Sequence, residues 1–293
     1  MNEWNGCLNK LRQGDYTAWP KHEWIRTGRF DTHDQFEPTP TFGLPVWDGS
    51  EDSTVLVNAD CGMGDTICFY RWMSQIKAKT VLRCDADLSD LFLDQRTCSK
   101  DDPIPDDVDS VIHIMAIPQV LGITEITGKK YIEPHGNDFL MPLRLTKFTK
   151  VGVCWSGNPF NPRDNERSIP VEKFDFWDDF KPFSLVKHEK SPEFMMDVRH
   201  YMEDWLMTSK LISIMHVVIS VDTAVAHLAA SMGRPTWLLL PEKADWRWGD
   251  SGETTSWYDS IKIFRKKTTW EDLLKEVKND VLNNCPEPEV TYL

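Results

Sequence analysis

Apolar positions along the first half of the chain alternate between two spacings, which predict strands and helices in turn. Three short apolar runs rich in β-branched residues, each typical of a buried strand, lie at 53–60, 80–85 and 109–116. Apolar residues recur at helical spacing over 66–79, and a short helix is expected over 87–94. Strands that alternate with helices predict a parallel α/β sheet with right-handed crossovers.

The same alternation starts again after a join near residues 136–149. Strands are expected within 150–159, 182–187, 216–222, 235–241 and 260–264, and helices at 203–215, 223–232 and 268–282. The economical interpretation is an α/β protein with two consecutive Rossmann-like halves. Ligands bind at the carboxyl ends of strands in open parallel sheets, so two such sheets facing each other would form a cleft.

The composition is that of a globular protein with room for two cores. The chain has 293 residues, of which 41% are hydrophobic and 27% charged, and it has no apolar run that approaches the length needed to span a bilayer. Its start lacks the apolar block of a signal peptide. Seven cysteines are scattered without CxxC spacing. They indicate reduced thiols in the cytoplasm, without integral membrane association, a disulfide framework or a zinc site.

The net charge of −13 argues against broad contact with a polyanion. It leaves open a local basic groove, for which residues 264–267 and 147–150 are the candidates. Nucleic acid is therefore a minor alternative among possible partners.

The segment 217–241 reads as a strand, a tight turn, a helix and a second strand. Asp222 and Thr223 stand at the turn, where Thr223 is expected to cap the helix ahead of Ala224 and Val225. Small residues at a helix start let a phosphate approach the free N–H groups, and the helix dipole favours its charge. The alternative is a capped, buried helix that binds nothing.

A second strand-turn-helix contains the sequence GMGD. Gly62 and Gly64 allow a tight turn, and a dinucleotide site is one interpretation, with Asp85 as the ribose-binding acid. Against it, Ile67 replaces the third glycine, and Asp65 would put a negative charge where the pyrophosphate must lie. Asp65 is instead a candidate general base, or a simple helix cap.

The loop 154–170 follows a strand and is rich in polar side chains. Ser156, Asn158, Arg163 and Arg167 can donate hydrogen bonds to phosphate or sugar oxygens. A turn-rich surface loop is the alternative.

Other candidates are isolated. Lys187 follows a strand and can meet a phosphate as a point charge. Asp85 and Asp87 form a DxD pair that is favoured here as a helix cap over a metal site. His227 is expected to be a packed histidine, and 245–248 offers aromatic walls for a base or sugar.

Six segments together resemble one family in order and spacing: VWDGS, GMGDTICFYRW, VGVCWSGNP, RSIP, ISVDTAVAHLAASMGRPTWLLLP and DWRW. They look like the glycosyltransferase module found after tetratricopeptide repeats in bacterial proteins, which is similar to the ADP-heptose:lipopolysaccharide heptosyltransferases. The resemblance runs from about residue 45 to the end, and residues 8–30 resemble the last repeat before that module.

The resemblance implies a GT-B fold and a division into three parts. Residues 1–44 would be a remnant of a repeat, 45–148 an acceptor domain and 149–293 a nucleotide-sugar donor domain. It also implies an inverting, metal-independent transfer that needs no cofactor beyond a nucleotide-diphosphate sugar as donor. The acceptor would be a glycan, with a protein or a hydroxymethylated DNA base as alternatives.

The resemblance assigns Asp65 as the base that deprotonates the acceptor hydroxyl. The residues that would bind substrate or donor are Gly62, Gly64, Thr66, Ser156, Gly157, Arg167, Lys187, Asp222, Thr223, Ala224 and Trp246. Two departures from the family's pattern, Val186 in place of glutamine and His216 in place of an acid, put the donor's identity in doubt. An NAD-dependent Rossmann enzyme and a non-catalytic nucleotide-sugar-binding module remain alternatives.

Overall fold

The computed structural model describes residues 3–27, 37–133, 149–175 and 182–285. The described chain divides into two compact units, each built on one parallel sheet. The first unit comprises Met1–Thr127 together with Trp246–Gly249, and the second comprises Gly128–Asp245 and Asp250–Leu293. The join expected near 136–149 lies almost wholly outside the described residues, and the limits of the three functional parts stay a prediction.

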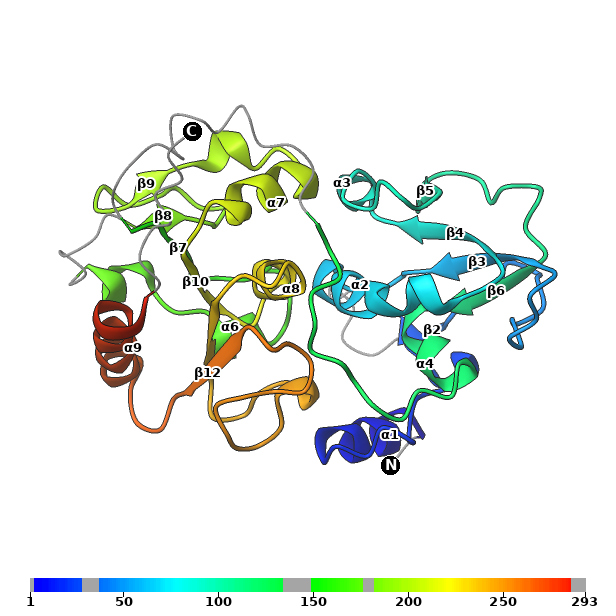
Figure 1. Ribbon diagram of the computed structural model, residues 1–293, viewed down its shortest axis with the longest axis horizontal. Helices are drawn as coiled ribbons and strands as arrows, with labels where there is room; N and C mark the ends of the chain where they lie inside the picture. The colour runs from blue at the N-terminus through cyan, green and yellow to red at the C-terminus, as the bar shows by residue number, and fades with distance from the viewer. Residues whose placement is uncertain (1–2, 28–36, 134–148, 176–181, 286–293) are drawn as a thin grey trace. The chain divides into compact units, whose positions relative to one another are not determined.

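The first unit has a four-stranded sheet in the order β5-β4-β3-β6, with every neighbouring pair parallel. Its strands are β3 (Thr54–Asn58), β4 (Lys79–Cys84), β5 (Thr97–Ser99) and β6 (Ser110–His113). The apolar residues of β3 and β6 are fully buried, because a parallel sheet is covered on both faces. Figure 1 shows α2 lying across this sheet.

Short helices and turns precede, connect and follow these strands. They are α1 (Glu3–Arg12), η1 (His22–Trp24), α2 (Met63–Phe69), η2 (Tyr70–Gln75), α3 (Ala86–Ser89), η3 (Ile114–Ala116) and α4 (Ile117–Val120), with a small antiparallel pair β1 (Arg26–Thr27) and β2 (Glu37–Pro38). The helix expected over 66–79 begins earlier, at Met63, and tightens into a 3-10 turn at Tyr70. It cannot reach residue 79, because Lys79 already pairs with Thr54 in the sheet.

The second unit has a six-stranded parallel sheet in the order β12-β11-β10-β7-β8-β9. Its strands are β7 (Val151–Cys154), β8 (Phe183–Ser184), β9 (Met196–Asp197), β10 (Val217–Val221), β11 (Thr236–Leu240) and β12 (Ile261–Arg265). Its helices and turns are α6 (Asp164–Arg167), η5 (Val171–Phe174), η6 (Arg199–Tyr201), α7 (Trp205–Ser213), α8 (Ala224–Ser231) and α9 (Trp270–Asn284).

Helix α8 packs against β10 and β11, and its residues from Val225 to Ser231 are buried. Alanine side chains allow this close packing, because they hold the helix axis near the sheet. β10 and its neighbour β7 are central strands in register, with Ser220 opposite Cys154. The turn after β10 and the loop after β7 therefore leave the same edge of the sheet together.

The predicted α/β fold with two parallel sheets is confirmed. All seven cysteines are free thiols. Within the described residues, none of the helices is both long and apolar enough to cross a bilayer. The resemblance of residues 8–30 to a repeat stays a prediction, and its last three residues lie outside the described ranges.

Candidate functional site

The start of α8 has no side-chain cap. Thr223 occupies the N-cap position with an extended backbone, but its side chain makes no capping hydrogen bond. Its hydroxyl instead faces inward, 3.0 Å from Ser220 Oγ and 3.6 Å from Cys154 Sγ. The expected side-chain cap is therefore wrong, because buried polar partners hold the hydroxyl. The first N–H that the helix itself satisfies is that of His227, which donates to the Thr223 carbonyl.

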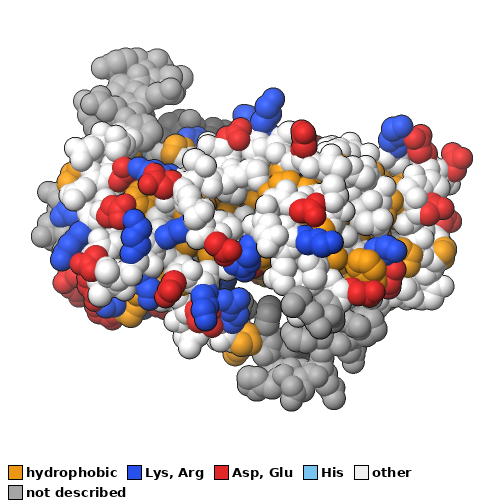
Figure 2. All heavy atoms as spheres, turned by 90° about the horizontal axis from the view of Figure 1, so that it is seen from below, with side chains coloured by type: hydrophobic (Ala, Val, Ile, Leu, Met, Phe, Trp, Pro, Cys, Tyr) orange, Lys and Arg blue, Asp and Glu red, His pale blue; other side chains and the backbone are white. Residues whose placement is uncertain are grey.

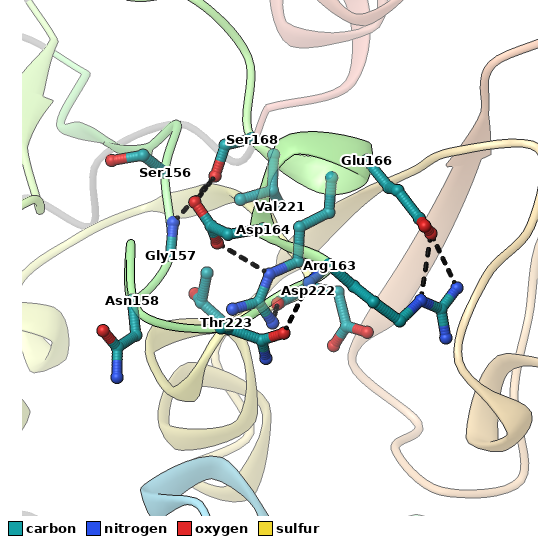
Figure 3. Close-up of polar contacts among 12 residues, drawn as sticks. Ser156, Gly157, Asn158, Arg163, Asp164, Glu166, Ser168, Val221, Asp222 and Thr223 are labelled. Atoms are coloured by element: carbon teal, nitrogen blue, oxygen red, sulfur yellow. Dashed lines mark hydrogen bonds and ion pairs between the residues drawn. The ribbon is translucent and has the colours of Figure 1, made fainter. Parts of the chain in front are cut away.

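The loop after β7 is tied together by a chain of hydrogen bonds that ends at the same turn (Figure 3). The Gly157 N–H donates to Ser168 Oγ (3.0 Å), and that hydroxyl donates to Asp164 Oδ2 (2.7 Å). Arg167 donates through Nε to Asp164 Oδ1 (3.0 Å) and through Nη1 to the main-chain oxygen of Asp222 (2.5 Å). The structure therefore brings Gly157, Arg167 and Asp222 together.

Only glycine fits at position 157 in this arrangement. A Cβ there would lie 2.5 Å from Asp164 Oδ1 and would also collide with the Arg167 guanidinium. A larger residue would push apart the pair that anchors the Asp222 turn. The sequence marked Gly157 and Arg167, but it gave no signal for Asp164 or Ser168, which hold them.

His227 is packed inside α8, as expected. Its Nδ1 lies 2.9 Å from the Tyr258 hydroxyl, and its Nε2 lies 3.9 Å from Asp222 Oδ1. Both ring nitrogens thus face polar atoms, and the buried ring lies next to the Asp222 carboxylate. The histidine acts as a support for the turn and is not exposed to solvent.

Ser156 faces an acid that sequence reasoning missed. Its hydroxyl donates to Glu189 Oε1 (2.7 Å), Trp155 Nε1 donates to Oε2 (3.1 Å), and His188 Nε2 lies 3.2 Å from Ser156 Oγ. Burial raises the pKa of the Glu189 carboxyl, but the hydrogen bonds from Ser156 and Trp155 outweigh burial and hold the pKa below its ordinary value. The loop after β7 therefore faces an ionised carboxylate that comes from the segment after β8.

Lys187 does not share this network. It is exposed, and its ammonium donates to the main-chain oxygen of Glu203 (2.6 Å). Ala224, at the first position of α8, is half-buried. The second unit thus gathers Gly157, Arg167, Asp222, Thr223 and Ala224, with Ser156 on the same loop.

The remaining predicted residues lie in the first unit, around the start of α2. Gly62 is the N-cap, and Gly64 and Asp65 are in the first turn. Thr66 is fully buried, and its hydroxyl donates to the Gly62 carbonyl (3.3 Å), so it shapes the turn from within. A Cβ on Gly62 would lie 3.1 Å from Asp65 Oδ2, so the carboxylate folds back over the turn.

An arginine that sequence reasoning did not single out contacts the Asp65 carboxylate. Arg247 Nη2 forms an ion pair with Asp65 Oδ1. The guanidinium carbon lies 4.4 Å from the centre of the Trp246 ring and 5.5 Å from that of Phe69. Trp246 itself is buried, so it forms part of this packing and offers no open wall to a ligand.

Asp85 is occupied elsewhere in the first unit. It precedes α3 without a capping hydrogen bond, and its carboxylate pairs with Lys100 Nζ at 3.0 Å. The favoured role as a side-chain cap is therefore wrong, because the lysine holds the carboxylate. Among the described residues, no three His, Cys, Asp or Glu side chains gather in a way that could hold a metal ion.

Comparisons of the whole chain connect this fold to one class of protein. No protein-family profile matches, and no curated protein is similar in sequence. Among solved structures, the chain is similar to a family 9 glycosyl transferase from Veillonella parvula, with 12% identity and a TM-score of 0.54 over 81% of this chain and 91% of that one. The chain therefore has the GT-B-like fold of a glycosyltransferase.

Two further solved structures have lower TM-scores. The iron-containing dodecameric glycosyltransferase TibC of E. coli is 11% identical, with a TM-score of 0.49 over 79% of this chain and 67% of that one. The E. coli ADP-heptose lipopolysaccharide heptosyltransferase II is 10% identical, with a TM-score of 0.46 over 78% and 99%.

Proposed function

We propose that this protein is a glycosyltransferase that moves a sugar from a nucleotide-diphosphate sugar to an acceptor hydroxyl, with inversion and without a metal ion. The observation that carries the proposal is the uncapped start of α8, next to a turn held in place by Arg167. The glycosyltransferase fold of the chain supports it. The free thiols favour the cytoplasm as its location.

The donor diphosphate is proposed to bind at the start of α8. The N–H groups of Ala224, Val225 and Ala226 precede the first intrahelical hydrogen bond, and the helix dipole adds positive potential there. The inward turn of the Thr223 hydroxyl leaves this space to phosphate oxygens. Asp222 would accept a hydrogen bond from a donor hydroxyl.

The loop after β7 and the segment after β8 are proposed to complete the donor site. Arg167 supplies positive charge near the turn, and Lys187, being exposed, can swing toward a phosphate as negative charge builds on the leaving group. Glu189 beside Ser156 is suited to sugar or ribose hydroxyls, because an ionised carboxylate repels phosphate but accepts hydrogen bonds.

Asp65 is proposed as the general base. In a single displacement the acceptor oxygen attacks the anomeric carbon, its proton passes to Asp65, and the bond to the diphosphate breaks with both electrons leaving on the phosphate oxygen. Attack from the face opposite the leaving group inverts the anomeric centre. Gly62 leaves room for the carboxylate, since a Cβ there would lie 3.1 Å from Asp65 Oδ2, and about a third of the Asp65 side chain is exposed.

The first experiment is a thermal-shift screen of nucleoside diphosphates, nucleotide sugars and NAD, each with and without EDTA. ADP-heptose belongs in the panel, because the solved heptosyltransferases of similar fold are named for it. A ligand bound by the folded state raises the melting temperature in proportion to its occupancy. One nucleoside diphosphate that stabilises the protein regardless of EDTA supports the proposal and names the base.

Other outcomes of the screen would favour other functions. Stabilisation by NAD alone would favour a dinucleotide-dependent enzyme at the GMGD turn. Stabilisation that EDTA removes would contradict metal independence. Binding of a nucleotide sugar without hydrolysis or transfer, across glycan, protein and modified-DNA acceptors, would favour a non-catalytic binding module.

Changing Asp65 to Asn tests the base directly. The substitution keeps the shape of the side chain but removes the proton acceptor, so we expect transfer to fall by at least ~100-fold while the donor-induced thermal shift is unchanged. Product formation is measured by chromatography of the released nucleoside diphosphate. Asp90→Asn, an exposed change in the same unit, is the matched control. Full transfer by the Asp65 variant would remove Asp65 as the base.

A further inference from the structure

Arg247 is a buried cation beside the partly exposed carboxylate that the proposed function uses. The side chain of Arg247 is 5% exposed and that of Asp65 is 32% exposed, and the two form an ion pair. Asp65 Oδ1 faces the guanidinium, while Oδ2 lies beside Gly62. One oxygen of the carboxylate is thus held by the arginine, while about a third of the side chain stays exposed.

The helix that carries Asp65 also holds the arginine in place. Phe69 lies four residues after Asp65 in α2, on the same face of the helix. The guanidinium lies near the rings of both Phe69 and Trp246, and cation–π attraction strengthens when such a cation is desolvated. Because both aromatic contacts are buried, Arg247 has little freedom to move away from Asp65.

We propose that Arg247 is a positioning residue for the transfer reaction, which keeps the Asp65 carboxylate ionised and turned toward the acceptor hydroxyl. The inference rests on the proposed function, because it takes Asp65 as the base. Arg247 gives up no proton and forms no bond during the step, since a guanidinium stays protonated in proteins. The acceptor's proton passes only to Asp65.

The arginine comes from a distant part of the chain. It follows Asp65 by 182 residues and stands in the segment Trp246–Gly249, between β11 and β12 of the second unit's sheet. This segment packs within the first unit, where it contacts α1. The proposed base of the first unit is therefore completed by a segment whose two flanks belong to the second unit.

A purely structural role is the competing explanation, and a second buried arginine supplies the control for it. Arg71 lies just beyond α2, is equally buried, stacks over Trp72 at 5.8 Å and donates to the Cys68 carbonyl at 2.9 Å. Its guanidinium also donates to the Thr127 carbonyl (3.4 Å), so it holds main-chain oxygens. Arg71→Gln therefore removes a comparable buried, stacked cation whose hydrogen bonds support the backbone.

The test compares Arg247→Gln, Arg247→Lys and Arg71→Gln in the full-length protein. We expect Arg247→Gln to lower kcat by about 100-fold, leave the donor-induced thermal shift unchanged, and move the acid limb of the pH–rate profile to higher pH. Arg247→Lys keeps the charge but loses the planar stack, so its kcat should be intermediate. Arg71→Gln should leave kcat and the pH profile of the folded protein unchanged, whatever it does to the melting temperature.

A readout that needs no activity completes the test. Difference infrared spectra of each protein against its Asp65→Asn counterpart follow protonation of the Asp65 carboxyl directly. Titration at higher pH in Arg247→Gln supports the inference. Identical titration and kcat in Arg247→Gln and the unchanged protein would overturn it. Should Arg247→Gln fail to fold, Arg247→Lys and Phe69→Leu replace it, because each weakens the hold on the Arg247–Asp65 pair. The same two measurements, kcat and the titration of Asp65, then test the inference.

The two proposals fail in distinguishable ways. If the protein transfers no sugar from any donor, the proposed function is contradicted. If the titration of Asp65 still responds to Arg247→Gln in that protein, the effect of Arg247 on the carboxylate is supported. Normal transfer with no response of kcat or titration to Arg247→Gln would contradict the inference alone.

Discussion

Arg167 holds the main-chain oxygen of Asp222, whereas Arg247 holds the carboxylate of Asp65, and the two contacts have different consequences. At Asp222 the arginine fixes the path of the backbone and leaves the carboxylate to other partners. At Asp65 the arginine fixes the carboxylate itself. A formal charge in the sequence therefore says little about its role until the atom it contacts is known.

A pair of buried histidines in the first unit makes stability depend on pH. The main-chain N–H of His113 donates to His22 Nδ1 (2.9 Å). The ring Nδ1 of His113 accepts from the main-chain N–H of Met115 (3.2 Å). Burial and then the neighbouring His22 lower the pKa of His113 to about 3. Burial also lowers the pKa of His22.

The sign of the effect follows from proton linkage. An unfolded histidine titrates near pH 6.5, so below that pH the unfolded chain binds more protons than the folded one, and stability falls as the pH falls toward 3. We expect His113 alone to cost about 2 kcal/mol of unfolding free energy between pH 7.5 and pH 5, measured by urea denaturation.

His113→Asn is the control for this prediction. Asparagine keeps an acceptor for the Met115 N–H but does not titrate, so the loss of stability at acid pH should shrink. An equal loss in both proteins would assign the acid sensitivity to other groups.

Which residue types form the site was predictable, but which atoms they contact was not. The small-residue helix at 224–231 predicts close approach from the sequence itself, whereas Gly157 was assigned through the family resemblance. The pairing of Asp65 with Arg247 depends on how a loop after β11 packs, and the partnership of Ser156 with Glu189 depends on where the chain after β8 turns. Each contact joins residues that are far apart in the chain, so no local spacing in the sequence predicts it.

At the scale of elements, strands with continuous apolar runs were predicted well and short edge strands were not. β10 and β11 are fully buried, so every position in them is apolar or small. β5 has only three residues, all half-buried, and β9 has only two, one half-buried and one exposed, so both strands are too short for a pattern to appear. The 3-10 turn after α2 was missed because its apolar spacing resembles that of an α-helix.

The start of α8 can be filled by a charge to test its role. Ala224→Asp puts a carboxylate in the first turn, where the helix dipole favours it by roughly 0.3–1 kcal/mol. We expect the melting temperature to stay level or rise slightly, while the thermal shift caused by a nucleoside diphosphate is lost, because the carboxylate repels the phosphates. Differential scanning fluorimetry measures both quantities in one experiment.

Ala224→Ser is the matched control, because it adds a polar group at the same position without a charge. It should keep most of the shift. If Ala224→Asp also keeps the full shift, the phosphates bind elsewhere and α8 is only a packed helix.

At the scale of the whole molecule, charge bears on the class of acceptor. The chain carries a net charge of −13, and Figure 2 shows acidic and basic side chains intermixed over the face it presents. Of the two basic clusters considered for a groove, 147–150 lies partly outside the described residues. In the other, Arg265 donates to the carbonyls of Gly252 and Ser251. This distribution favours a glycan or protein acceptor over DNA.

We therefore expect no measurable affinity for duplex DNA at physiological salt, with or without hydroxymethylated bases, because phosphate contacts by Lys and Arg supply most of the affinity for DNA. Fluorescence anisotropy of a labelled duplex, measured over a range of salt concentrations, checks this. Lys266→Glu is the control, since it removes charge from the one basic cluster that is wholly described. Tight binding that weakens steeply with salt, and that Lys266→Glu diminishes, would contradict the prediction and make a DNA base the leading acceptor. Binding that is absent in both proteins would direct the search for the acceptor to glycans and proteins.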